Sequence, residues 1–595
     1  MYIPTRRIRP RVLLATLTGI ALCIRLQSIS RDNRVVWDET HLGRFSSKYT
    51  TNTFYLDVHP PLGKLLLTLL FHLFGNTVST LGSFNFASGS TYPAEVPYTA
   101  VRIVQAVFGA LLVPLTFALC RYLKLPVAVA WMAAVFVAVD SALVGISRII
   151  VLDSMLLLAN ALVVFVFAYS RQALNGLSNS RRNISAAPWY WSLAMLGLTL
   201  GILCSIKLVG LLTVALLGTY VTVDLMLLSR YHCTIKKRFV TAWIVHGATL
   251  IALPLAIYFF GFAIHFSLLT NYSPEADSMG SDFIVQMNGS ALQIQPECIY
   301  DDSFVTIRSN GYPFEYLTTK NQSMASVQSR QQRILSTTKR FLVEDYFTIK
   351  RVDIGHSSMG KETISDGHFV QISVPKTRLF IVVSGGHQHN VQDYSVNLEA
   401  DARNSVSSAW RIELVSKPPL SITTTEHGYL GQIRPIFSKF KLVSAIHNCE
   451  LAIDYHAPLD GVVKHSQATG QYILKCLPAL GTVWNIEHQL STKDLPLTNI
   501  SRTIALSFIK QTVTYNRLMR QINSMLVSDP DMFSAVESAP LSWPFLSQPM
   551  QLVTWSDDSQ LKYLLIGNPV LWWSSAIFPA DLKAGLCLYN IHLGR

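Results

Sequence analysis

Long apolar segments recur through the first 262 residues and constrain the fold more than any other feature of the chain. A segment of about 17–25 apolar residues is long enough to cross a bilayer as a helix. A shorter segment, 12–26, follows several arginines, and we interpret it as an uncleaved anchor, with a cleaved signal peptide as the alternative. The run 62–74 is too short to span and predicts an interfacial or re-entrant helix. The segments that reach spanning length are 98–120, 125–144, 149–169, 189–206, 208–228 and 239–262.

The composition agrees with a membrane protein. Half of the 595 residues are apolar, 14% are charged, and the mean hydropathy is +0.32. An average soluble domain carries about 25% charged residues. The net charge of +13 does not indicate nucleic-acid binding, because the basic residues lie in short runs beside apolar segments. We predict a polytopic α-helical membrane protein with no nucleic-acid partner, with membrane regions at 1–262 and 563–595.

The basic residues of the connecting segments predict the orientation. They precede the first apolar segment and then lie in every second connection along the chain. Because lysine and arginine are enriched on the cytoplasmic side of membranes, these connections and the N-terminus are expected in the cytoplasm. The intervening loops and the residues after 262 are then lumenal or external. The basic residues are Arg6, Arg7, Arg9 and Arg11, Arg121 and Lys124, Arg171, Arg181 and Arg182, and Lys236, Lys237 and Arg238.

A hydrophilic insertion at 263–562 precedes the last apolar segment, 563–579. Two short alternating motifs each occur three times in it, and alternation of β-branched and aromatic residues indicates strands. Three copies predict one compact, three-fold all-β domain at 295–490 between linkers at 263–294 and 491–562, with chance recurrence as the alternative. The motifs are Val305-x-Ile307, Val370-x-Ile372 and Phe440-x-Leu442, and Phe347-x-Ile349, Trp410-x-Ile412 and Trp484-x-Ile486.

Cysteines and glycosylation sequons in the insertion agree with an oxidising compartment. Cys449 and Cys476 both lie in the third repeat and are the pair predicted to form a disulfide. No CxxC or His-x-x-x-His spacing indicates a metal site. On the predicted lumenal side, possible N-glycosylation sites are Asn271, Asn288, Asn321 and Asn499.

The loop after the first apolar segment concentrates ionisable residues. It contains the adjacent pair Asp38 and Glu39, followed by Asp57 and His59. Such a cluster just outside a span could supply a general base. Because neighbouring residues point in different directions, only one of the adjacent carboxylates is expected to be the base, and we favour Asp38.

Three cations are predicted at the outer ends of spans. They are Arg102, Arg148 and Lys207. Charges in membrane segments are costly, so each is a functional candidate, although snorkelling or a structural ion pair is the alternative for each alone. Cations at one depth, on the same side as the loop carboxylates, fit the phosphate of a lipid whose tail lies among the spans.

The chain resembles the eukaryotic protein O-mannosyltransferases, polytopic enzymes of the C-type glycosyltransferase fold. The resemblance covers nearly the whole chain in order, and it places a MIR domain, a β-trefoil, where the three-fold repeat lies. The residues that carry it are Val36–Gly43, Asp57–Lys64, Val96-Pro97-Tyr98 with Arg102, Ser147–Asp153, Ser205–Gly210, Ile264-His265-Phe266, Ser542–Leu546 and Tyr563–Trp573.

The resemblance implies a reaction and its residues. Mannose would pass with inversion from dolichyl phosphate mannose to Ser or Thr hydroxyls of Ser/Thr-rich proteins in the endoplasmic reticulum lumen. Asp38 and Glu39 would be the catalytic motif, and Arg102 would be needed for activity. Arg148 and Lys207 are our extension as further phosphate contacts. Homo- or heterodimers, a multi-pass endoplasmic reticulum location and no obligatory cofactor or metal are also implied.

Two departures from the family suggest alternatives. Family members continue through further spans after Trp572-Trp573, whereas this sequence ends at Arg595, so we expect part of the donor groove and one dimer surface to be missing. The first repeat reads Phe314-Glu315-Tyr316-Leu317 in place of the Leu-His-Ser-His pattern of the family. A catalytically reduced partner subunit of a full-length transferase is therefore one alternative. A transporter is the other, although it would need charges at mid-membrane.

Overall fold

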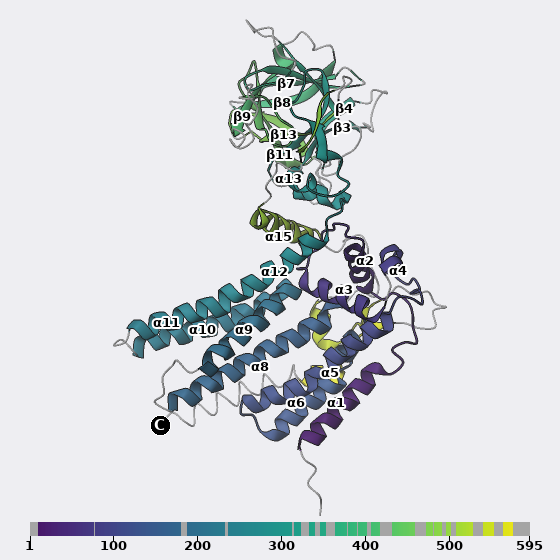
Figure 1. Cartoon of the computed structure of the whole chain (residues 1–595), viewed down its shortest axis with the longest axis vertical. Helices are drawn as coiled ribbons and strands as arrows, with labels where there is room; N and C mark the ends of the chain where they lie inside the picture. Colours follow the sequence, from purple (N-terminus) through teal and green to yellow (C-terminus); the bar gives the residue numbers. More distant parts are fainter. Residues whose placement is uncertain are drawn as a thin grey trace, which may run out of the picture. The chain divides into compact units, whose positions relative to one another are not determined.

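The structure is a computed structural model of the chain (Figure 1), and it separates into two compact units. The first unit comprises 1–53, 59–269 and 527–595, and the second comprises 54–58 and 270–526. The residues that the structure describes are 10–75, 78–179, 187–231, 236–311, 314–322, 332–338, 346–352, 363–375, 377, 379–388, 391–400, 406–416, 431–458, 472–479, 481–490, 495–500, 507–526, 540–552 and 563–574.

The first unit is helical. Its long helices are α1 (Pro10–Leu26), α5 (Tyr98–Tyr122), α6 (Val127–Val139), α8 (Leu152–Asn179), α9 (Ala187–Ile206), α10 (Leu211–Tyr231), α11 (Lys236–Gly247) and α12 (Leu253–Leu268). Shorter helices lie in the connections: α2 (Glu39–Thr50), α3 (Leu62–Phe74), α4 (Val78–Ser83) and α7 (Ser141–Ile146).

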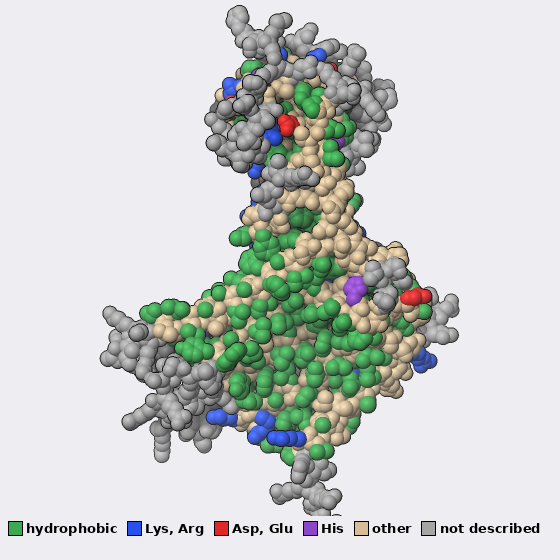
Figure 2. Space-filling view, in the orientation of Figure 1, with side chains coloured by type: hydrophobic (Ala, Val, Ile, Leu, Met, Phe, Trp, Pro, Cys, Tyr) green, Lys and Arg blue, Asp and Glu red, His purple; other side chains and the backbone are tan. Residues whose placement is uncertain are grey.

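The membrane character of this unit is confirmed. Within the described part of the chain, five helical stretches are long and apolar enough to span: Tyr98–Tyr122, Leu152–Arg171, Trp189–Ile206, Leu208–Met226 and Val240–Leu268. Figure 2 shows apolar side chains spread over the visible face of these helices. On α10, Leu212 and Leu216 are 72% and 71% exposed, as expected for side chains that contact lipid tails. The predicted anchor at 12–26 is the 17-residue helix α1, and the short run 62–74 is the helix α3.

The predicted span at 125–144 is wrong, because the helix breaks at Asp140. α6 ends at Val139, the backbone becomes extended at Asp140, and the six-residue α7 follows. Arg25 of α1 is fully buried and donates hydrogen bonds of 3.2 Å to the carbonyls of both Val137 and Ala138. These carbonyls belong to the last turn of α6, where intrahelical donors are missing. A residue of another helix therefore stabilises the break.

The last long helical stretch contains a π-helical turn. α11 continues through residues 248–252 in π geometry into α12, which extends six residues past the predicted end at 262. A Cβ on Gly197 of α9 would lie 1.9 Å from the carbonyl oxygen of Thr249 in that turn. The close approach of the two helices therefore requires glycine at 197.

The predicted last span, 563–579, is also wrong at its start. Residues 564–565 form the strand β16 (Leu564–Leu565), which pairs with β15 (Met550–Gln551). Helical structure begins only at 569, and the segment after 574 lies outside the described residues.

The second unit contains a β-trefoil, as the three-fold repeat predicts. Six strands close into a barrel in the pairing order β2–β5–β6–β9–β10–β13–β2, and three hairpins, β3–β4, β7–β8 and β11–β12, accompany it. The barrel strands are β2 (Ser303–Ser309), β5 (Phe347–Arg351), β6 (Phe369–Val374), β9 (Ala409–Ser416), β10 (Lys439–Ser444) and β13 (Trp484–Leu490). The hairpin strands are β3 (Tyr316–Gln322), β4 (Gln332–Thr338), β7 (Leu379–Gln388), β8 (Val391–Ala400), β11 (Glu450–Pro458) and β12 (Tyr472–Leu477).

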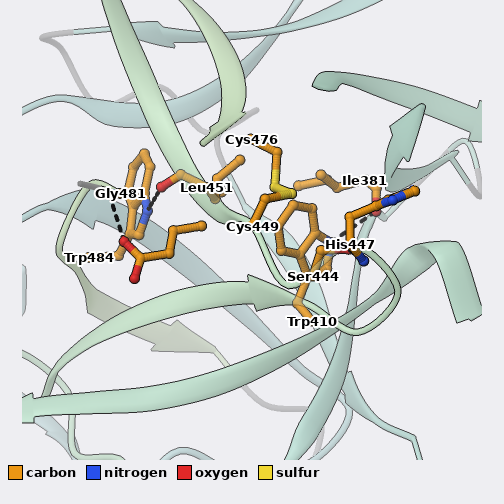
Figure 3. The surroundings of a disulfide bond; sticks show 10 residues. Ile381, Trp410, Ser444, His447, Cys449, Leu451, Cys476, Gly481 and Trp484 are labelled. Atoms are coloured by element: carbon orange, nitrogen blue, oxygen red, sulfur yellow. Dashed lines mark hydrogen bonds between the residues drawn. A yellow bond between two sulfur atoms is a disulfide. The ribbon is translucent and has the colours of Figure 1, made fainter. Parts of the chain in front are cut away.

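The two sequence motifs face each other in every repeat. The first residue of one motif pairs with the first residue of the other, in the pairs Val305↔Phe347, Val370↔Trp410 and Phe440↔Trp484. Trp410 and Trp484 are fully buried, and each indole N–H donates to a hairpin carbonyl, that of Ile381 at 3.0 Å and that of Leu451 at 3.2 Å (Figure 3). The repeats are therefore structurally equivalent.

A disulfide joins Cys449 and Cys476 in the third repeat (Figure 3). It links the start of β11 to β12, beside the buried Trp410. In the first repeat, the residues that replace the family pattern are interior: Glu315 is buried and accepts a 2.6 Å hydrogen bond from Thr337, and Tyr316 lies under the guanidinium of Arg308. The departure therefore has a structural role in this chain.

Candidate active site

The loop that carries the adjacent carboxylates begins with an unusual backbone turn. Trp37 has φ +49°, a left-handed conformation that is costly for a large side chain and recurs at functional sites. Asp38 is the N-cap residue of α2, and its carboxylate does not cap that helix. Its side chain stays half-buried, whereas that of Glu39 is fully buried. The turn therefore places the two neighbouring carboxylates in different environments.

Glu39 forms a buried ion pair with Arg102 of α5. The Arg102 Nε donates to Oε1 at 2.9 Å and Nη2 donates to Oε2 at 2.7 Å, so the guanidinium binds both carboxylate oxygens. The exposed fractions of the two side chains are 3% for Arg102 and 0% for Glu39. Two-point pairing of this kind is the strongest form of a charged hydrogen bond.

Three further donors complete the surroundings of Glu39. Backbone N–H groups of Val36 and Ile150 donate at 3.0 and 2.9 Å, and the hydroxyl of Tyr92 donates at 3.1 Å. Burial, and then the charge of Glu39, raise the pKa of Tyr92 well above its usual value, so the hydroxyl keeps its proton. Five donors therefore surround the two carboxylate oxygens of Glu39.

Stacked aromatic rings flank the ion pair. The rings of Tyr92 and Tyr98 lie parallel at 4.7 Å, and the guanidinium of Arg102 lies 5.0 Å from the ring of Tyr98. Cation–π contacts of this kind are stronger where water is excluded. The aromatic pair therefore helps to hold the charge of Arg102 inside the protein.

The three predicted phosphate-binding cations each have partners within the protein. Arg102 donates to Glu39 and to two backbone carbonyls, and its contact with a donor phosphate stays a prediction. Arg148 donates to the carbonyls of Ile24 and Gln27 at 3.0 and 2.7 Å. Lys207 pairs with Asp153 at 2.8 Å, with the two side chains 15% and 28% exposed. Of the two carboxylates that pair with these cations, Asp153 is therefore the more accessible, since Glu39 is 0% exposed.

The supporting loop leads into α3. Asp57 and His59 are half-buried, and the backbone carbonyl of His59 accepts a 2.7 Å hydrogen bond from the Lys64 ammonium. Lys64 is only 1% exposed, and its charge lies 5.2 Å from the ring of Phe45 of α2. The buried lysine therefore ties the start of α3 to the loop before it. Among the described residues, no three His, Cys, Asp or Glu side chains form a group that could hold a metal ion.

The sequence reasoning missed an acidic residue and its partners at the edge of this site. Asp32 accepts hydrogen bonds from Arg34 and, from far along the chain, from Tyr563. The signal for Tyr563 lay in the resemblance, since it opens the matched segment 563–573. Nothing in the local pattern around Asp32 indicated a partner that lies 531 positions away.

The four candidate glycosylation sites differ in exposure. Asn288 and Asn499 are exposed, whereas Asn271 is half-buried and its side-chain oxygen accepts a 3.4 Å hydrogen bond from Asn288. Asn321 lies in β3, and its side chain is outside the described part of the structure.

Comparisons with known proteins identify the family. Residues 15–270 match the family model of the dolichyl-phosphate-mannose-protein mannosyltransferases, and residues 508–591 match the model of the C-terminal four-span region of protein O-mannosyltransferase. Dolichyl-phosphate-mannose–protein mannosyltransferase 6 of Candida albicans is 29% identical over 94% of this chain and 70% of its own length. Dolichyl-phosphate-mannose–protein mannosyltransferase 3 of Saccharomyces cerevisiae is 28% identical over 97% of this chain and 74% of its own length.

The fold has a counterpart among solved structures. The structure of the S. cerevisiae protein O-mannosyltransferase Pmt1-Pmt2 complex bound to the sugar donor superposes with a TM-score of 0.78 and 24% identity, over 99% of this chain and 78% of that chain. The buried Glu39 pair and the helices around it lie within the first matched region, and the trefoil separates the two regions. The chain therefore belongs to the dolichyl-phosphate-mannose–protein mannosyltransferase family.

Proposed function

We propose that the chain transfers mannose from dolichyl phosphate mannose to Ser and Thr hydroxyls of proteins, and that Asp38 is the general base. The family, and relatives that are named for this activity, support the reaction class. The observation that carries the assignment of the base is the difference between neighbours: Glu39 is occupied by five donors, while Asp38 stays half-buried.

The chemistry needs one base and one displacement. The Asp38 carboxylate takes the proton of the acceptor hydroxyl as its oxygen attacks the anomeric carbon of mannose. The bond from that carbon to the phosphate oxygen breaks, and dolichyl phosphate leaves with the electron pair. A single displacement inverts the configuration at the sugar and leaves no covalent sugar on the protein.

Lys207 and Arg148 are the proposed contacts of the leaving phosphate. The ion pair of Lys207 with Asp153 is partly exposed, so an arriving phosphate can compete for the ammonium. Arg148 donates to the backbone carbonyls of Ile24 and Gln27, which are neutral acceptors, so its positive charge is the second proposed contact. Asp57 and His59 are proposed to support the loop that faces the acceptor.

The location and partners follow from the family and remain part of the proposal. We place the chain in the endoplasmic reticulum membrane as a multi-pass protein, with the N-terminus cytoplasmic and the MIR-like trefoil in the lumen. A homo- or heterodimer with another O-mannosyltransferase is the proposed assembly, and the acceptors are Ser/Thr-rich polypeptides. The predicted glycosylation at Asn271, Asn288, Asn321 and Asn499 belongs to the same lumenal placement.

The test is transfer of labelled mannose to a Ser/Thr peptide by membranes that carry the full chain. Wild type and Arg44→Gln, which changes an exposed charge on α2, should transfer, and Asp38→Asn should not. The product should have the anomeric configuration opposite to that of the donor. Retention of the anomeric configuration would contradict a single-displacement mechanism. If the chain alone transfers no mannose, and its Asp38→Asn variant still stimulates transfer by a co-expressed relative, the chain is a regulatory subunit instead.

A further inference from the structure

A segment from far along the chain docks beside the catalytic loop. Leu552 is buried in the same apolar core as Val35 and Val36, and its backbone N–H donates to the carbonyl of Tyr563 at 3.0 Å. The hydroxyl of Ser141 donates to the carbonyl of Ile566 at 2.7 Å, next to the break between α6 and α7. The segments 550–552 and 563–568 are therefore fixed against the first loop and α7 rather than lying loosely on them.

Tyr563 makes the polar contact of this segment with the loop. Its hydroxyl donates to Oδ2 of Asp32, and Arg34 binds the same carboxylate from Nε at 3.0 Å and from Nη2 at 2.8 Å. The Asp32 side chain is 9% exposed. The guanidinium of Arg34 also lies 6.0 Å from the ring of Tyr563. Asp32, Arg34 and Tyr563 thus form one small cluster, which we name the clasp.

The clasp is connected to the buried ion pair through the backbone. Nη1 of Arg102 donates to the carbonyl of Asp32 at 2.7 Å, and Nη2 donates to the carbonyl of Arg34 at 2.8 Å. The same guanidinium binds Glu39, the neighbour of Asp38. The far edge of this backbone is held by residues 89–92, where the Val35 N–H donates to Ser90 at 2.8 Å. A hydrogen-bonded path therefore runs from the Tyr563 hydroxyl to the residue beside the proposed base.

We infer that Tyr563 is a positioning residue for mannose transfer, acting through Asp32 and Arg34 on the Arg102–Glu39 pair. The inference rests on the proposed function, because its readout is that reaction. The two carbonyls that Arg102 binds are fixed only while Asp32 and Arg34 keep their orientation. A small displacement of the Arg102 guanidinium would move Glu39, and with it the start of α2 and the Asp38 carboxylate. Misplacement of a reacting group by about 1 Å can cost about 10²-fold in rate.

The ionisation of Asp32 gives this role a signature. Burial alone would raise the pKa of Asp32, but the hydrogen bonds from Arg34 and Tyr563 outweigh it and hold the pKa below its usual value. The clasp therefore forms with the carboxylate charged and is lost as the pH falls through that lowered pKa. Without the Tyr563 hydroxyl, the pKa of Asp32 rises, so the loss begins at a higher pH.

The experiment compares Tyr563→Phe with Tyr169→Phe, which removes a more exposed hydroxyl from α8 of the same unit. Both are measured as the full chain in membranes, for kcat, the KM of donor and acceptor, the pH–rate profile and the melting temperature. For Tyr563→Phe we expect kcat about 10-fold lower, with both KM values within about two-fold of wild type. The acidic limb of its pH–rate profile should move to higher pH, and its melting temperature should not change. Asp32→Asn should lower kcat at least as much. Its pH–rate profile should not show the shifted acidic limb, because the carboxylate that titrates has been removed.

The outcomes separate this inference from the proposed function. A wild-type kcat and pH profile in Tyr563→Phe, with Asp38→Asn inactive, would overturn only the positioning role. A fall in kcat matched by an equal fall in folded protein would also overturn it, because the hydroxyl would then be merely structural. Full activity in Asp38→Asn would overturn the proposed function whatever Tyr563→Phe does.

Discussion

Removing the positive partner of the buried ion pair should destabilise the membrane unit strongly. The change is Arg102→Met, which keeps much of the side-chain volume and removes the charge. Glu39 is then left with a charged carboxylate that is 0% exposed and has three neutral donors, from Val36, Ile150 and Tyr92. Breaking a buried pair by removing one partner costs about 3–5 kcal/mol, because the remaining charge has lost its compensation.

A double-mutant cycle separates the interaction between Arg102 and Glu39 from the other effects of each substitution on stability. Glu39→Gln with Arg102→Met replaces both charges, so the double variant should be less destabilised than the sum of the single ones, with a coupling free energy of about 2–3 kcal/mol. Arg102→Lys is the matched control for charge. A lysine keeps the charge but cannot bind both carboxylate oxygens and two carbonyls in one plane, so it should give an intermediate loss.

The assay is equilibrium unfolding of the purified chain in mixed micelles, followed by the fluorescence of tryptophans in the helical unit. The cycle gives the coupling free energy directly. A loss of less than about 1 kcal/mol in Arg102→Met, which is the range of exposed ion pairs, would show that the pair behaves as solvent-exposed and would contradict this prediction. Strictly additive single variants would refute it as well.

Three other changes test the packing of α2, the disulfide of the trefoil and the role of Lys207. In Gly43→Ala, a Cβ would lie 2.1 Å from the ring of Phe86, so we expect a lower melting temperature and less transfer, and partial recovery in Gly43→Ala with Phe86→Leu; no change in the single variant would contradict the packing of α2. Loss of the disulfide in Cys449→Ser with Cys476→Ser should lower the unfolding free energy of the trefoil by about 2–4 kcal/mol, measured by denaturant titration, and an equal stability would contradict its role. Lys207→Gln should raise the KM for the lipid donor several-fold, with a smaller effect on the acceptor KM. An unchanged donor KM would show that Lys207 does not bind the donor phosphate.

The sequence predicts this fold well wherever a pattern is local. The apolar runs that became α5, α9 and α10 depend on composition over one helix, and the trefoil depends on pairs of residues that recur in each strand. The break at Asp140 was missed for a different reason. The run around it is continuously apolar, and the break is stabilised by Arg25 of another helix and by the Asn568 N–H, which donates to the Asp140 carboxylate at 3.1 Å.

Some features of the candidate site could also be predicted from the sequence, and others could not. The adjacent carboxylates and Arg102 were found because unusual charges beside apolar runs are visible in the sequence. The burial of Glu39 was not predicted, because it depends on the left-handed backbone at Trp37 and on hydrogen bonds donated by Ile150 and Tyr92. The pairing of Arg102 with Glu39 was not predicted, because a partner 63 positions away cannot be inferred from spacing, and the contact of Arg102 with a phosphate stays a prediction.

The role of Asp38 as the base is measured by the single-turnover rate of mannose transfer in Asp38→Asn, with donor binding determined in the same preparation. We predict a rate lower by about 10²–10⁴-fold, the usual contribution of a general base, with donor affinity unchanged. A rate within about ten-fold of wild type at equal donor binding would contradict the assignment of Asp38 as the base.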